Sequence, residues 1–338
     1  MTARQRTVAL IGAPLLVLIL GQDACSHGAP FAVVDQGTDR PFISAEPTLL
    51  TYGGGRDASW LPDGSAILYT GATSADQPDN DCLGLLPPSG GRIRRTICHR
   101  RGPAQRDSAH VLEAAAESPR GRLVYLHSSR DLSRDTFGWY PRELVLADSA
   151  DPSDGRTLGR VPAFGLRTHT GVSQTRWLDE RRFIYRADDD DFFFRVTTGL
   201  FIMLVEVDAD PAVFMVVPGT DSATGVAVQD ADAIIYSLAR DSRVYRRTLS
   251  TGQVAVLWDF GAGMEVRDVQ LARTRLVAIL PTTGDAGRIA VVDLDQATSR
   301  ILDTGLRAWR HPALSPDGRH VVAETDDASP ALYLFTIP

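Results

Sequence analysis

The sequence predicts an all-β fold, a six-bladed β-propeller, and two observations predict it. First, a unit of strand, tight turn and strand recurs, most clearly in Asp57–Thr70 (DASWLPDGSAILYT) and Trp309–Thr325 (WRHPALSPDGRHVVAET). In both turns Pro presets the backbone and Gly accepts a positive φ. Second, apart from the N-terminus, no window of about 12 residues carries a clean apolar stripe of helical period.

The second strand of each unit gives the spacing of the repeat. Six copies align, and four of them end in Tyr: Ile67–Tyr69, Leu123–Tyr125, Ile184–Tyr185, Ile234–Tyr236, Leu276–Ala278 and Val321–Ala323. A period of ~40–60 residues with four short strands in each unit is typical of a β-propeller.

The last copy lacks a fourth strand, because the chain ends soon after its third strand, Ala331–Ile337. Glu46–Tyr52 (EPTLLTY) precedes the first copy and has no partner of its own. We expect this N-terminal strand to pair at the edge of the last blade, which closes the ring and removes an unpaired edge. The propeller is then predicted over residues 46–338.

The LPDG turn at Leu61–Gly64 and the SPDG turn at Ser315–Gly318, with Trp60 before the first, resemble the WD-type repeats of TolB-like six-bladed propellers. The resemblance covers residues 46–338, and two copies carry the full motif. It implies protein binding on one propeller face, without catalysis. TolB has a further α/β domain before its propeller, and this sequence enters its first blade almost at once, so the role of that domain is not implied.

Residues 1–24 are predicted to be a signal peptide. Arg4 and Arg6 precede an apolar stretch, Val8–Leu20, that is short for a membrane span. The following Ala24-Cys25 resembles a bacterial lipoprotein cleavage site, in which Cys25 carries the lipid. Simple secretion and an uncleaved anchor are the alternatives. Residues 25–45 are polar with scattered Gly and Pro, and we expect a tether there. The protein is therefore expected in the bacterial periplasm or anchored to a membrane.

Cys82 and Cys98 are equidistant from Gly90 in a predicted hairpin. On adjacent antiparallel strands they lie opposite one another, at a separation that suits a disulfide. An exported protein favours this bond over two buried thiols. With Cys25 lipidated, no thiol among the three cysteines is left over.

The composition is that of an ordinary globular protein, with 43% apolar and 23% charged residues. The formal charge of −7 argues against nucleic-acid binding. No G-x-S-x-G, H-E-x-x-H, C-x-x-C or Gly-rich phosphate loop occurs, so no catalytic residue, cofactor or metal is predicted. Asp188–Asp191 precedes three Phe residues, and four adjacent carboxylates fit a solvated loop better than a calcium site.

Polar side chains gather where the inner strands begin, at the expected channel mouth. They are Arg56, Asp57, Glu113, Gln174, Arg267, Asp268, Arg310 and His311. Carboxylates hold a metal at such places in lactonase-type propellers. Here Arg and acids alternate without a repeated ligand spacing, so ion pairs that seal the channel are favoured over a ligand site. Arg56, Asp57, Arg310 and His311 form the candidate binding face.

The sequence leaves three functions open. The first is a non-enzymatic, exported binding scaffold for an envelope protein or peptide, which we expect to be a monomer. The second is a hydrolase of lactonase type with its site in the channel. The third is a purely structural component of the envelope. Neither the partner nor a substrate is identified by the sequence.

Overall fold

The computed structural model describes residues 42–44, 47–51, 54–74, 77–98, 108–131, 143–152, 155–161, 170–191, 196–283, 286–303, 308–327 and 329–337. The chain divides into Met1–Thr38, which lies outside these ranges, and Asp39–Pro338, which holds every described strand. The predicted signal peptide and Cys25 therefore lie outside the described residues. Within the described ranges, no helix is long and apolar enough to cross a membrane.

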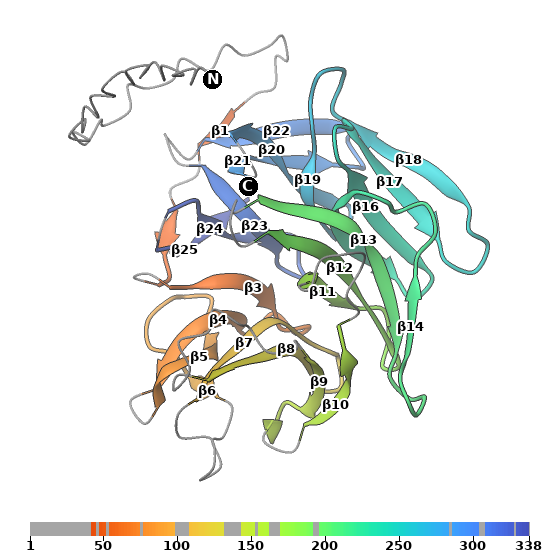
Figure 1. Ribbon diagram of the computed structural model, residues 1–338. Helices are drawn as coiled ribbons and strands as arrows, with labels where there is room; N and C mark the ends of the chain where they lie inside the picture. The colour runs from red at the N-terminus through yellow and green to blue at the C-terminus, as the bar shows by residue number, and fades with distance from the viewer. Residues whose placement is uncertain are drawn as a thin grey trace, which may run out of the picture. The chain divides into compact units, whose positions relative to one another are not determined.

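Successive strands form antiparallel groups of four, numbered in chain order (Figure 1). The third and fourth groups are separate sheets, whereas single bridges between Asp81 and Val111 and between Gly287 and Trp309 join the other groups in pairs. The first group contains β3 (Arg56–Trp60), β4 (Ile67–Ser74), β5 (Gln77–Leu86) and β6 (Arg95–Ile97). The second contains β7 (Ser108–Glu117), β8 (Arg122–Asp131), β9 (Glu143–Asp148) and β10 (Arg156–Arg160). The third contains β11 (Thr170–Trp177), β12 (Arg182–Asp191), β13 (Val196–Glu206) and β14 (Val213–Val216).

The second half of the chain repeats this order. The fourth group contains β15 (Ala223–Asp230), β16 (Ala233–Leu238), β17 (Arg243–Thr248) and β18 (Val254–Asp259). The fifth contains β19 (Arg267–Ala272), β20 (Arg275–Thr283), β21 (Ala286–Asp293) and β22 (Thr298–Asp303). The last contains β23 (Trp309–Leu314), β24 (His320–Thr325) and β25 (Leu332–Thr336), with β2 (Thr48–Leu49) as its fourth strand.

The first strand of each group, here called the inner strand, contacts the inner strands of the neighbouring groups. These contacts run in chain order from β3 through β7, β11, β15 and β19 to β23, and β23 also contacts β3. In Figure 1 the orange first strands accordingly lie beside the blue last strands. At the outer edge, β2 pairs with β25, and the amide of Leu50 donates to the carbonyl of Leu332 at 2.8 Å.

The apolar core lies between successive groups. One cluster joins Leu126 and Leu144 of the second group to Phe183 and Tyr185 of the third, and another joins Ile67 of the first group to side chains of the last. These side chains are almost completely buried, and each such burial contributes about 1.5–3 kcal/mol. Apolar side chains of neighbouring strand groups therefore pack against one another and hold the groups together.

The turns and their Trp residues follow the sequence motif. The amides of Gly64 and Gly318 close the expected LPDG and SPDG turns at 2.9 and 2.8 Å, and the amide of Gly121 closes an equivalent turn with the sequence SPRG at 3.0 Å. The indole N–H of Trp60 donates to the carbonyl of Ala313 at 3.0 Å, and Trp177 donates to Ala116 at 3.0 Å. Each Trp before a turn thus bonds to the inner strand of the preceding group.

The Cys82–Cys98 disulfide is present, with the two Cα atoms 4.6 Å apart. Leu83 of β5 pairs with Ile97 of β6, so the two cysteines lie directly opposite at the open side of this hairpin, where the symmetry about Gly90 places them. The bond closes a loop on the outer edge of the first group.

Two segments differ from expectation. Phe42–Ser44, inside the expected tether, form β1 and pair in parallel with β22, because Phe42 and Ile43 favour extended structure. Asp188–Asp191, expected in a loop, continue β12 and pair with β13. The hydrogen-bonded partner strand outweighs the low strand propensity of Asp. The Phe residues at 192–194 lie outside the described residues.

Candidate functional site

The inner strands carry a β-bulge near their starts, and the bulges position the candidate residues. The register with the second strand shifts by one residue at this point in each of the inner strands. In five of them the bulged residue has a positive φ of 43–51°: Asp57, Ala114, Gln174, Asp268 and His311. Positive φ is uncommon for residues other than Gly, and such strain concentrates at functional sites.

The fourth inner strand has Gly225 at the equivalent position, which does not adopt a positive φ but lies unusually close to the next inner strand. A Cβ atom at this position would lie 2.5 Å from the amide nitrogen of Val269 and 2.7 Å from that of Asp268. Only Gly allows the backbones of β15 and β19 to approach this closely. The fourth inner strand therefore contributes close backbone packing at this position, without a side chain.

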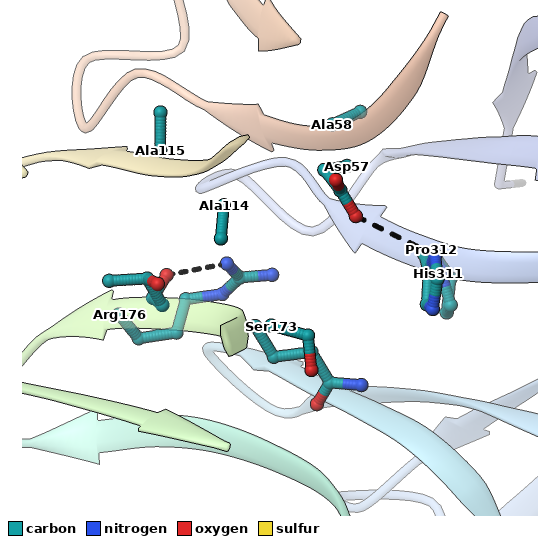
Figure 2. A pocket seen from close by; sticks show the side chains of 10 residues that line it. Asp57, Ala58, Ala114, Ala115, Ser173, Arg176, His311 and Pro312 are labelled. Carbon is teal, nitrogen blue, oxygen red and sulfur yellow. Dashed lines mark hydrogen bonds and ion pairs between the residues drawn. The ribbon is translucent and has the colours of Figure 1, made fainter. Parts of the chain in front are cut away.

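Asp57, His311 and Glu324 converge on one point (Figure 2 shows Asp57 and His311). The imidazole Nδ1 of His311 lies 2.6 Å from a carboxylate oxygen of Glu324 and 3.9 Å from one of Asp57. The second oxygen of Glu324 accepts the amide of Asp57 at 3.1 Å. One imidazole nitrogen and two carboxylate oxygens are a donor set that also suits a divalent transition metal.

Charge within this cluster favours a protonated His311. Burial opposes the charged imidazole, but Glu324, Asp268 and Asp57 outweigh it and raise the pKa of His311 to about 10. Burial, together with the charge of Glu324, raises the pKa of Asp57 to about 6. At neutral pH the arrangement is therefore an ion-paired imidazolium between carboxylates.

Asp268 accepts hydrogen bonds and forms an ion pair in a second cluster, which lies next to the first. Its carboxylate lies 3.1 Å from the guanidinium of Arg186, and both side chains are almost fully buried. The side-chain amide of Gln174 donates to the same carboxylate, and its oxygen accepts the amide of Val226 at 2.7 Å. The amide of His311 donates to the other oxygen of Asp268 at 3.3 Å, which links the two clusters.

Little space remains between these side chains. The cavity that Asp57, Ala114, Gln174, Arg176 and His311 help to line has a volume of about 20 Å³ (Figure 2). That volume holds about one water molecule.

No family model matches the sequence, and no curated protein matches it. Among solved structures, a luciferin-regenerating enzyme is similar at a TM-score of 0.54 and 13% identity, covering 86% of this chain and 96% of that one. TolB from Acinetobacter baumannii is similar at 0.51 and 14%, covering 82% and 62%. The β-propeller domain of Cps50 (Swd1) from Myceliophteria thermophila is similar at 0.50 and 11%, covering 87% and 100%. The chain has a β-propeller fold. These identities establish the fold and carry no activity with them.

The candidate binding face of the propeller is charged but internally paired. Arg56 lies 3.2 Å from Glu113, and Arg310 forms an ion pair with Asp326. Each of the two Arg side chains keeps about a third of its surface exposed. The four predicted residues thus meet as two adjacent pairs, Arg56–Asp57 and Arg310–His311, on neighbouring inner strands that contact each other.

Sequence reasoning missed Glu324 and Arg186, the partners of His311 and Asp268. Both lie on second strands, and both directly follow the aligned apolar triplet of their repeat. The same position holds Thr70, Leu126, Ser237 and Ile279 in the other copies. A charged residue at a repeat position that is otherwise apolar or weakly polar is the signal that could have found them.

A second hollow of the propeller lies among the turns that carry Arg120, Glu180, Arg181 and Asp208. It is open and measures about 730 Å³. Ser118 donates to Glu180 at 2.8 Å, and Asp208 lies 3.0 Å from Arg122 and 3.5 Å from Arg181. These contacts connect the turns of the second and third groups.

Proposed function

We propose that this protein is a non-enzymatic, exported, six-bladed propeller that holds another protein or peptide of the cell envelope. Each four-stranded group is one blade, and β2 closes the last blade. The contacts of the inner strands from β3 round to β23 and back, together with the β2–β25 pairing, support this reading. The apolar stretch before Cys25 supports export, with a lipid on Cys25 as the anchor.

The observation that carries the proposal is the small cavity among the ion-paired side chains of the inner strands. His311 is ion-paired with Glu324 and lies near Asp57, Asp268 is ion-paired with Arg186, and the cavity beside them has a volume of about 20 Å³. Catalysis on a small substrate needs titratable groups that converge on free space large enough for the reacting atoms. Binding on a broad face needs only rigid loops, which the hydrogen-bonded blades supply.

The experiment is partner capture from a membrane extract by the tagged full chain. The double variant Arg56→Ala, Arg310→Ala should capture less partner while it melts close to the wild type, because both side chains are partly exposed. Arg156→Ala with Arg160→Ala on β10 is the matched control, since it removes two exposed Arg side chains from the outer edge of a blade. Equal capture by the wild type and the first double variant contradicts a role for this face.

The channel hydrolase remains the second candidate, and one observation favours it. Asp57, His311 and Glu324 offer three ligand atoms within 4.8 Å of one another. Metal analysis of the purified protein separates the two functions. Stoichiometric metal, together with an esterase or lactonase activity that a chelator abolishes, supports the enzyme and contradicts the scaffold.

A further inference from the structure

Two histidines of the second group bond to each other across β7 and β8. Nδ1 of His110 lies 3.0 Å from Nε2 of His127, and the ring centroids are 5.3 Å apart with planes inclined by 14°. His110 is 2% exposed, and His127 is partly buried. In the register His110 lies opposite Ser129 and His127 opposite Leu112, so the imidazoles are diagonal neighbours on one side of the sheet.

That side of the sheet faces the first group. Leu112, opposite His127, belongs to an apolar cluster that includes side chains of the first group. Val111, the neighbour of His110, forms a backbone bridge with Asp81 of β5 in the first group. The pair therefore lies beside a backbone contact between the first two groups, and a displacement of His110 acts on that contact.

The charged residues beside the pair come from four strands: Asp81 of β5, Glu113 of β7, Glu143 of β9 and Arg160 of β10. Glu143 lies directly opposite His127 in the register, and Arg160 lies 3.9 Å from Glu143. Glu113 is paired with Arg56 of β3 at 3.2 Å, and β4, which also packs against β7, carries no charge. A carboxylate opposite His127 favours the addition of one proton to the pair.

The hydrogen bond between the two imidazoles limits how many protons the pair can carry. A neutral imidazole has one N–H and one ring nitrogen that accepts, whereas an imidazolium has two N–H groups. The bond needs a proton on one of the two facing nitrogens and a lone pair on the other, so it is compatible with no charge or with one charge. A second charge puts a proton on both facing nitrogens, and two cations then repel each other across 3.0 Å.

We infer that the His110–His127 pair is an acid-sensitive switch, which opens when both imidazoles are protonated and then releases the start of β7 from the first group. An ordinary imidazole has a pKa of about 6.5, so the second proton binds in mildly acidic solution. Glu113 follows His110 by three residues in the same strand, so the opening also reaches the ion pair between Glu113 and Arg56 of the candidate binding face. The switch is a property of this hairpin and stands independently of the proposed function.

The test is hydrogen exchange of the full chain, measured by mass spectrometry at about pH 7.5 and about pH 5.5, on either side of the ordinary imidazole pKa. After correction for the chemical exchange rate, β7 should exchange at least about tenfold faster at the lower pH. β15 contains no histidine and reports any change in the stability of the whole fold. His127→Gln keeps a donor and an acceptor but takes no proton, so its β7 should exchange equally at both pH values. His320→Gln, which removes a histidine from β24, is the matched control and should keep the wild-type difference.

Either of two exchange results overturns the inference. The first is equal exchange of β7 in the wild type at both pH values. The second is a pH difference that His127→Gln leaves unchanged, which assigns the effect to another group. NMR titration of the two rings in the wild-type chain is a further measurement that needs no variant. Two protonation steps at separate pH values support the shared hydrogen bond, and a single common step contradicts it.

Discussion

The imidazole of His311 lies 2.6 Å from the carboxylate of Glu324, and the two residues come from adjacent strands of the last group. His311 occupies the bulge of β23, with a φ of 43°, while Glu324 lies in the regular part of β24. The bulge turns the imidazole into the channel, where Asp57 and Asp268 add two more carboxylates. The positive φ of His311 therefore coincides with the ion pairs that its imidazole forms with these carboxylates.

The first prediction concerns the pKa of His311. Replacing Glu324 with Gln removes the nearest carboxylate, so the pKa should fall from about 10 toward the ordinary value of 6.5. An NMR titration of the His311 ring measures it directly. Asp326→Asn is the control, because Asp326 pairs with Arg310. An unchanged pKa of His311 in the Glu324→Gln variant means that the ion pair with Glu324 does not keep the imidazole protonated.

The same pKa sets a pH dependence of stability. A His whose pKa is raised on folding contributes stability that is complete below 6.5 and is lost as the pH rises to about 10. Folding raises the pKa of Asp57 from 3.8 to about 6, so deprotonation of this carboxyl lowers the stability of the folded state as the pH rises from 3.8 to about 6. We expect urea melts to show stability falling between pH 6.5 and 10, and a flatter profile for His311→Gln. Equal slopes for both proteins contradict the prediction.

The disulfide should stabilise the first blade. The double variant Cys82→Ala, Cys98→Ala is expected to lose about 2–3 kcal/mol of unfolding free energy, because the disulfide links two residues that are 16 positions apart in the sequence. Denaturant unfolding of both proteins measures the difference. Peptide mapping without reductant provides the control, and it should find the two cysteines linked in protein from an oxidising compartment. Alkylation of both thiols in that protein is the contrary result.

The lipid on Cys25 is tested by fractionation. Cys25→Ser should move the protein from the membrane to the soluble fraction, because a lipidated Cys is the expected anchor. Mass spectrometry of the wild-type N-terminus should find a modified Cys25. A mature N-terminus at another residue, or unchanged fractionation of the variant, argues for secretion or an uncleaved anchor.

Ring closure predicts a loss of cooperativity when the N-terminal strand is removed. A chain that begins at Gly53 lacks β1 and its pairing with β22 as well as β2, the bond from Leu50 to Leu332 and the bond from the amide of Leu332 to the hydroxyl of Thr51, so a chain that begins at Pro47 is its control. The edge of β25 is then exposed. Calorimetry should show a lower Tm and a broader transition than for the full chain. Identical melting of the two proteins shows that the strand does not close the fold.

The sequence predicts the features that recur in every strand–turn–strand unit, and it does not predict side chains or strands that occur in one or two units. The strand–turn–strand unit located the inner strands, so Asp57 and His311 were expected at the channel mouth. Glu324 and Arg186 were missed, because their strands read as apolar and a single charged residue at the strand end does not disturb that pattern. β1 was missed for a related reason, since Phe42–Ser44 is too short to show alternation in a polar segment.

The recurring bulge gives this fold a set of interchangeable positions around its axis. The backbone at Ala114, with a φ of 50°, matches that at Asp57 and Asp268 within the same ring, and Ala114 lines the same small cavity as His311. Ala114→Asp would therefore place a carboxylate at a φ that Asp57 and Asp268 already adopt, beside a cavity that holds about one water molecule. Single substitutions at these bulge positions can therefore change the charged groups at the centre of the molecule, while the strands that carry them keep the same backbone.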